Sequence, residues 1–191
     1  MKKKLFFVII ICTAFLTGAK LKFKEDFFRL HYMPLKPDNP DYQRNLFWLQ
    51  YAVSAPYAPP IQALVISKTP EMYEKYKILL QMTLFYHMAM NEIAVAARFD
   101  KHEPVFFNKE YAADIIQSLS YARVHYNNAL SYWNEMVKYK TAAEKYKKIE
   151  IDMSFQQDIL TRVDDGTLNL ERVVTRKLEN LDTKAEFFRN P

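Results

Sequence analysis

The sequence contains only one cysteine and two glycines in 191 residues. Because Cys12 lies in an N-terminal apolar run, residues 20–191 contain no cysteine, which excludes disulfide bonds and thiol catalysis there. Gly166 is the only glycine in the same region, whereas tight β-hairpins use glycine where φ is positive. The same shortage excludes a glycine-rich phosphate loop and a nucleophile-elbow motif. We therefore expect an all-α protein.

The first 19 residues have the layout of a secretory signal peptide. "MKKK" precedes an apolar run from Leu5 to Leu16, and small residues precede a cut after Ala19. The run is shorter than the roughly 20 residues that span a bilayer, and an uncleaved anchor is the alternative. We expect export to the periplasm and no stable membrane span after cleavage. Losing the three lysines at 2–4 lowers the net charge from +5 to +2, which does not favour nucleic acid as a partner.

Four segments follow from composition and periodicity: a signal peptide at 1–19, an extended N-terminal arm at 20–38, a helical core domain at 39–150, and a C-terminal helical arm at 151–191. The N-terminal arm holds two prolines and lacks clean periodicity. A first core helix is expected from Asn39 as the cap and Pro40 at the first helical position. Leu46, Leu49 and Val53 should be buried, and Pro56 ends this helix.

Two long helices dominate the expected core. The first begins at the cap-and-proline signal Thr69-Pro70 and carries apolar residues at steps of four and three. They are Met72, Tyr76, Leu79, Thr83, Tyr86, Met90, Ile93 and Ala97. The second runs over 109–148 with the same spacing. Its seam is Ile115, Leu119, Ala122, Tyr126, Ala129, Trp133 and Met136. We expect an antiparallel hairpin rather than a membrane span, since polar residues interrupt 78–97 five times.

In the C-terminal arm, Ser154 and Gln157 have capping-box spacing, and Gly166 stands where a helix should stop. An amphipathic helix follows from Leu170 to Phe188, and the pattern leaves open whether it docks on the hairpin or projects. The basic run at 138–148 interleaves lysines with tyrosines. It is interpreted as a solvated helix face rather than an RNA-binding surface.

Recognisable chemistry is sparse, and we expect no enzyme activity, no metal and no cofactor. His87 near Glu92 is interpreted as a core histidine rather than an acid–base pair. A hydrolase using Glu92 with Glu135 as a carboxylate pair is a third functional hypothesis.

Aromatic residues are the distinctive feature: 14 phenylalanines, 13 tyrosines and two tryptophans. Most must belong to the core, but tyrosine and tryptophan also anchor protein interfaces. The candidate protein-binding residues are Trp48, Tyr51, Tyr57, Pro59, Pro60, Tyr132 and Trp133. The alternative function is binding of an apolar small molecule or lipid in a pocket lined by Met82, Met88 and Met90.

The segment "SLSYARVHYNNALSYWNEM" resembles one helix of a tetratricopeptide repeat, although no 34-residue period accompanies it. Together with "NLFWLQYAVSAPYAPPIQAL" and "YKILLQMTLFYHMAMNEIAVAARFDKHEPVFFN", it resembles small exported helical proteins of the spirochaete flagellar motor collar. The resemblance covers about residues 40–140. It implies a non-enzymatic periplasmic scaffold that contacts other collar or motor proteins, with no catalytic residues.

Overall fold

The computed structural model describes residues 21–32, 41–101 and 109–189. These residues form an all-α protein with no strand among them, as the sequence predicts. The elements are α2 (Lys24–Tyr32), α3 (Tyr42–Ser54), α4 (Pro70–Phe99), the 3₁₀ turn η2 (Lys109–Tyr111), α5 (Ala112–Glu144), α6 (Ser154–Asp164) and α7 (Leu170–Arg189). The expected signal peptide at 1–19 lies outside the described residues.

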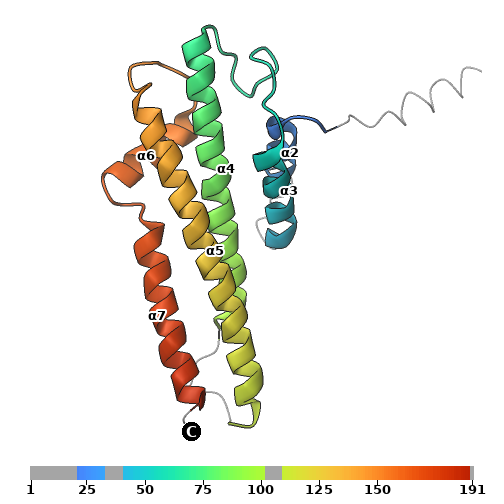
Figure 1. Cartoon of the computed structure of the whole chain (residues 1–191), viewed down its shortest axis with the longest axis vertical. Coiled ribbons are helices and arrows are strands. Elements are labelled where there is room, and N and C mark those ends of the chain that lie inside the picture. The colour runs from blue at the N-terminus through green and yellow to red at the C-terminus, as the bar shows by residue number, and fades with distance from the viewer. Residues whose placement is uncertain (1–20, 33–40, 102–108, 190–191) are drawn as a thin grey trace, which may run out of the picture.

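The α4–α5 pair is the centre of the fold. Figure 1 shows the two helices side by side over most of their length, with α7 beside α5 and the α2–α3 pair beside α4. All seven seam positions predicted for α5 are buried. Alanines at 122, 129 and 143 alternate with large side chains such as Tyr126 and Trp133, which lets the neighbouring helices approach closely. The expected hairpin is confirmed.

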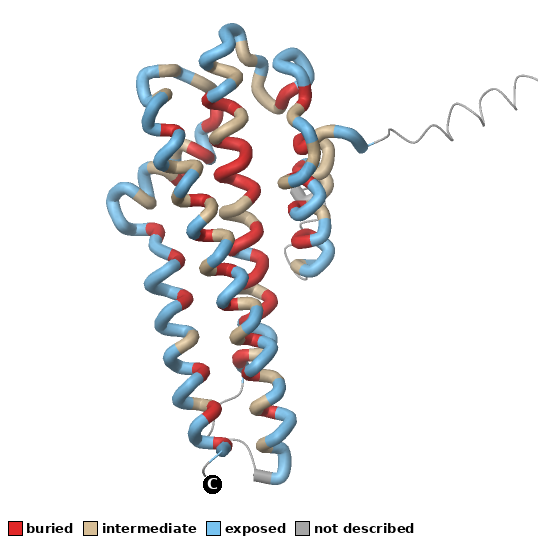
Figure 2. Tube along the Cα trace, viewed as in Figure 1, coloured by how far each residue is buried: buried red, intermediate tan, exposed pale blue. Residues whose placement is uncertain are grey.

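The predicted seam of α4 is correct only in its first half. Tyr76, Leu79 and Thr83 are fully buried, but Met90 is 39% exposed and Ala97 is exposed. A stripe spaced by 3.5 residues drifts around a straight helix of 3.6 residues per turn, so the buried face leaves the stripe after a few turns. In Figure 2, buried positions recur along α4 and are interrupted by intermediate and exposed ones. None of the described helices is both long enough and apolar enough to cross a membrane.

Helix ends follow the sequence signals unevenly. Thr69 caps α4, its side chain accepting from the Met72 N–H at 3.2 Å, with Pro70 in the first turn as predicted. Helix α3 is capped by Asp41 rather than Asn39. The predicted Ser154 capping box is wrong, because Met153 occupies the cap position of α6 without a side-chain bond. Gly166 has a φ of 75° and follows the end of α6, so its role as a helix stop is confirmed.

The expected extended arm is instead helical over most of its described part, since Lys24–Tyr32 forms α2. The signal is local: Glu25 and Asp26 lie in the first turn, where the helix dipole favours negative charge. The Asp26 carboxylate also accepts from the backbone N–H groups of Lys22 and Phe23, at 3.1 and 2.9 Å. These bonds satisfy donors near the N-terminus of the helix and outweigh the weak periodicity.

Helix α7 docks along α5, which resolves the alternative that the sequence leaves open. Its buried residues are Leu170, Val174, Leu181, Ala185 and Phe188. At the end of α4, the buried Asp100 carboxylate accepts from Lys184 Nζ at 2.9 Å and from the Tyr126 hydroxyl at 3.1 Å. Lys177 Nζ lies 3.7 Å from the same carboxylate. One buried anion therefore joins α4, α5 and α7.

The hairpin seam should dominate stability. Leu79→Ala removes a side chain with no exposed surface, so we expect a loss of about 2–5 kcal/mol in the free energy of unfolding. Val124→Ala, at a position of α5 that is 56% exposed, is the control and should change it by less than about 0.5 kcal/mol. Urea unfolding followed by circular dichroism measures both. Equal effects of the two substitutions would contradict the assigned seam.

Candidate functional site

Four aromatic side chains of α2 and α3 form a continuous surface, which we call the aromatic face: Phe27, Phe47, Trp48 and Tyr51. The Phe27 ring stacks on Tyr51 at a centroid distance of 5.7 Å and lies 6.3 Å from Trp48. Phe47 contacts Trp48 at 4.9 Å and Tyr51 at 4.8 Å. Such tilted and offset arrangements are favourable for aromatic rings, so the four side chains support one another.

The aromatic face is open to solvent. Phe47 is 48% and Tyr51 50% exposed, while Phe27 and Trp48 are half-buried. Single exposed apolar residues are common on soluble proteins, but contiguous ones more often mark an interaction site. Trp48 and Tyr51, two of the sequence candidates, belong to this face. Phe27 and Phe47 were not among the candidates.

The other side of α3 fixes the aromatic face to the core. Leu46 and Leu49 are buried as predicted, whereas Val53 is only half-buried. The Asn45 side-chain amide donates to the Asn91 side chain of α4 at 3.3 Å, and both residues are buried. Side chains three and four residues apart share one face of a helix, so the burial of 45, 46 and 49 turns 47 and 51 outward.

The proline corner after α3 is divided between core and surface. The Tyr57 hydroxyl lies 3.2 Å from both the Lys77 carbonyl and the Gln81 side-chain oxygen of α4, and burial raises the pKa of Tyr57. Ala58 is buried, and its carbonyl accepts from the Tyr73 hydroxyl at 2.6 Å. Pro59 and Pro60 are exposed. Among the sequence candidates, Tyr57 therefore anchors the corner, while the two prolines remain accessible.

Glu25 ties α2 to both the corner and the hairpin. Its carboxylate is almost fully buried, and it accepts from the Tyr76 hydroxyl of α4 at 2.7 Å and from the Ala58 N–H at 2.9 Å. Tyr76 in turn accepts from the Leu64 N–H at 3.1 Å, and burial raises the Tyr76 pKa. Hydrogen bonds to a carboxylate are stronger than neutral ones. Three segments distant in sequence are therefore held at one point beneath the aromatic face.

The neighbouring Lys24 closes the end of α3. Its ammonium donates to the carbonyl of Ala52 at 3.0 Å and to that of Val53. These are last-turn carbonyls, which have no helical partner and carry the negative end of the dipole. Burial lowers the pKa of Lys24 to about 8, and the adjacent Glu25 charge partly opposes that shift. Two buried ionisable groups, Lys24 and Glu25, thus fix the helices that carry the aromatic face.

The two remaining candidates for protein binding lie elsewhere. Trp133 is 4% exposed and packs in the hairpin core, so the prediction that it contacts a partner is wrong. Its helical spacing with Ala129 and Met136 already placed it on the seam. Tyr132 is half-buried, with its ring 6.3 Å from that of Phe85. Neither joins the aromatic face.

The histidine and carboxylate pairs differ from those considered from the sequence. Glu92 is buried and bonded to His125 Nδ1 at 2.5 Å, not to His87. His87 instead stacks on Phe155 of α6 at 5.7 Å. Glu135 bonds Lys138 at 2.6 Å and lies ten residues beyond His125, or about 15 Å along the helix axis. Glu92 and Glu135 therefore do not form the proposed carboxylate pair.

The methionines of the alternative hypothesis have different surroundings. Met82 and Met88 are buried in the core cluster, whereas Met90 is 39% exposed. Within the described ranges, no group of three or more histidine, cysteine, aspartate or glutamate side chains is arranged to hold a metal ion. Because the three methionines are divided between the core and the surface, the structure gives no particular support to an apolar pocket around them.

Residues 71–191 match the family model described as Domain of unknown function (DUF8513), and the chain belongs to that family. No curated protein and no solved structure matches the sequence. The matched region begins one residue into α4 and continues through α7. The α2–α3 pair with its aromatic face therefore precedes the matched region.

The Glu25 junction can be tested by an isosteric change. Glu25→Gln leaves one acceptor oxygen for two donors and places an NH₂ group against the Ala58 N–H or the Tyr76 hydroxyl. We expect a loss of about 1–3 kcal/mol in the free energy of unfolding. Glu179→Gln, on the exposed side of α7, should be nearly neutral. If Glu25→Gln were equally neutral in chemical denaturation, the junction would not be stabilising.

Lys24 predicts a pH dependence. With a folded pKa of about 8, below its ordinary value of 10.5, the folded protein binds fewer protons than the unfolded chain between these two values. The Lys24 contribution to stability should therefore rise with pH in that window, by about 2 kcal/mol between about pH 7.5 and 9.5. The raised pKa values of Tyr57 and Tyr76 reverse the trend only above about pH 10. There the tyrosines of the unfolded chain lose protons that the folded protein retains, so stability falls.

Lys24→Met should flatten this rise. Comparing urea unfolding of the two proteins at both pH values isolates the Lys24 contribution, since other groups titrate alike in each. A slope unchanged by the substitution would show that Lys24 does not titrate in this window.

Proposed function

We propose that the protein is a non-enzymatic helical scaffold, exported to the periplasm, that binds a second protein through its aromatic face. The observation that supports this most strongly is the contiguity of four aromatic rings, two of them half-exposed, on a firmly anchored helix pair. Trp and Tyr dominate binding energy at protein interfaces because they bury much area at low cost in conformational entropy.

The anchoring favours a pre-organised binding surface. Neighbouring rings restrict the rotamers of Phe47 and Tyr51, and Lys24 and Glu25 fix the helices that carry them. A surface already in its bound conformation loses little entropy on association. The exposed Pro59 and Pro60 extend the accessible apolar surface of the same N-terminal region.

The partner we propose is another exported structural protein, a component of the flagellar motor collar. Two features of the sequence support this assignment: the secretory layout at 1–19 and the resemblance over residues 40–140 to collar proteins. We assign the Glu92–His125 contact a structural role, because it joins α4 to α5 within the packed hairpin and Asn128 lies 3.4 Å from the same carboxylate.

Phe47→Ser combined with Tyr51→Ser should abolish partner binding while the fold is kept. Both side chains are about half-exposed, so the loss should fall on the interface rather than on the core. In-cell crosslinking followed by pull-down of the exported protein should recover collar components with the wild type. Recovery should fall more than about tenfold with the double variant, as expected for interface hot spots.

Tyr121→Ser combined with Phe187→Ser is the matched control, since these aromatic residues of α5 and α7 are 50% and 54% exposed. It should retain the partner. Equal loss of the partner with both double variants would indicate nonspecific adhesion. If the pull-down of the wild-type protein recovered no other protein, the scaffold proposal would be refuted.

A further inference from the structure

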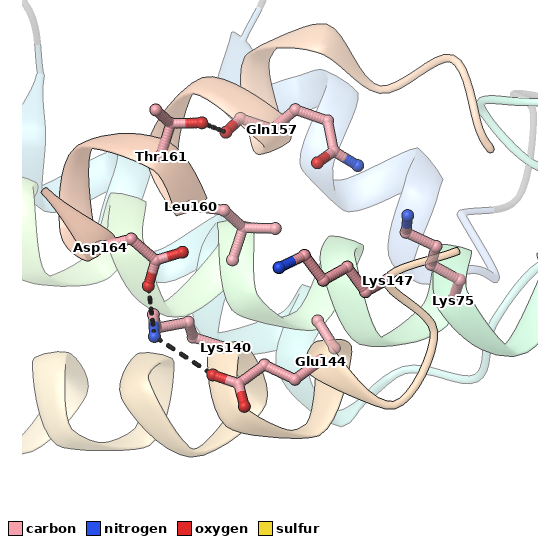
Figure 3. Close-up of a pocket in the computed structure, with 9 residues that line it drawn as sticks. Lys75, Lys140, Glu144, Lys147, Gln157, Leu160, Thr161 and Asp164 are labelled. Atoms are coloured by element: carbon pink, nitrogen blue, oxygen red, sulfur yellow. Dashed lines mark hydrogen bonds and ion pairs between the residues drawn. The ribbon is translucent and has the colours of Figure 1, made fainter. Parts of the chain in front are cut away.

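A concave site, separate from the aromatic face, lies where α6 meets the end of the hairpin. It is a pocket of about 680 Å³, within the range of small-molecule sites. Its walls come from the start of α4, the end of α5, the turn after α5, and α6 (Figure 3). The residues that line it are Lys75, Lys140, Ala143, Glu144, Lys147, Gln157, Leu160, Thr161 and Asp164.

On one wall, a single ammonium lies between two carboxylates. Lys140 Nζ lies 2.7 Å from an Asp164 oxygen and 3.4 Å from a Glu144 oxygen, and Figure 3 shows this ammonium between the two carboxylates. The hydrogen bond to Asp164 raises the pKa of Lys140. This network joins α6 to α5 and leaves that wall with one more negative than positive charge, so the positive charge of the pocket must come from other residues.

Lys75 is different, because it is 5% exposed and lacks a carboxylate partner among the described residues. Its ammonium donates to the backbone carbonyl of Ile149 at 2.6 Å. Burial lowers the pKa of Lys75, and no opposing charge offsets the shift. Buried charges in proteins are normally paired, since a neutral acceptor recovers only part of the lost hydration.

Lys147 brings a second positive charge to the same pocket. It lies in the turn after α5, and its ammonium forms no ion pair with any described carboxylate. Figure 3 shows this ammonium among the side chains that line the pocket, which include Lys75 and Gln157. Two ammonium groups that form no ion pair with a described carboxylate, and one side-chain amide, therefore line the same pocket.

We propose that this pocket binds a small anion through a phosphate or carboxylate group. Such an anion would supply the counter-charge that buried Lys75 lacks and would accept from Lys147 and Gln157. Charge-assisted hydrogen bonds of this kind are among the strongest polar contacts in proteins. The ligand would also bridge α4, the turn after α5, and α6. The site lies within the family-matched region and does not depend on the aromatic face.

Calorimetric titration of the full-length protein with inorganic phosphate and with succinate, at matched ionic strength against chloride, tests the proposal. We expect saturable binding of at least one of the two, and the stronger of them identifies the headgroup. Lys147→Gln should weaken binding at least about tenfold while the unfolding transition without ligand is unchanged. Lys148→Gln, an exposed lysine next in the chain that does not line the pocket, should bind as wild type does.

A second measurement covers the buried lysine. Trace acetylation with peptide mapping should show Lys75 protected when the anion is saturating, while Lys148 reacts at an unchanged rate. The result is independent of whether Lys75 variants fold. No saturable heat with either anion, or equal weakening by Lys147→Gln and Lys148→Gln, would overturn the proposal, because either would indicate only general attraction to surface charge.

Discussion

The packing of α4 against α5 is the constraint on which the rest of the structure depends. These helices, 30 and 33 residues long, bury Tyr76, Leu79 and Tyr126 completely. The other described helices are shorter, and most have one buried stripe, so each needs a long partner to cover it. Helix α3 covers one side of α4, and α7 covers α5. The hairpin therefore supports both the helices that carry the aromatic face and the walls of the pocket that contains Lys75 and Lys147.

Buried polar groups decide where the shorter helices dock. Glu25 joins α2, the proline corner and α4, while Asp100 joins α4, α5 and α7. Apolar stripes alone are non-directional and tolerate sliding. A buried carboxylate with two or three donors has few satisfactory positions, because leaving any of them unmade is costly. The two anions therefore define register at opposite ends of α4.

Local and periodic signals in the sequence were sufficient for part of the fold. The Thr69-Pro70 start, the Gly166 stop and the seven-residue seam of α5 depend on neighbours in the chain, and the structure confirms them. The register of α4 was lost after Tyr86 because a heptad pattern drifts on a straight helix. Helix α2 was missed because its stability comes from Asp26 and from contacts with distant segments.

The candidate site was predictable only in outline. Trp48 and Tyr51 could be proposed from composition, whereas the helical spacing of Trp133 with Ala129 and Met136 already indicated the core rather than an interface. Phe27 could not be predicted from the sequence as part of the site, because its place in the aromatic face depends on α2 packing beside α3. The pocket was hidden for a related reason: Lys75 and Lys147 are 72 residues apart, and the lysine run around 147 alone indicates a solvated face.

Lys24 and Lys75 show how similar groups serve different purposes. Both are buried, both have lowered pKa values, and both donate to backbone carbonyls. Lys24 closes the negative end of α3 beside the Glu25 carboxylate, so its charge is used within the fold. Lys75 bonds the carbonyl of Ile149, which lies in a non-helical turn, and lines an open pocket. Because Lys75 forms no ion pair with a described carboxylate, its positive charge is the one that an external anion can stabilise.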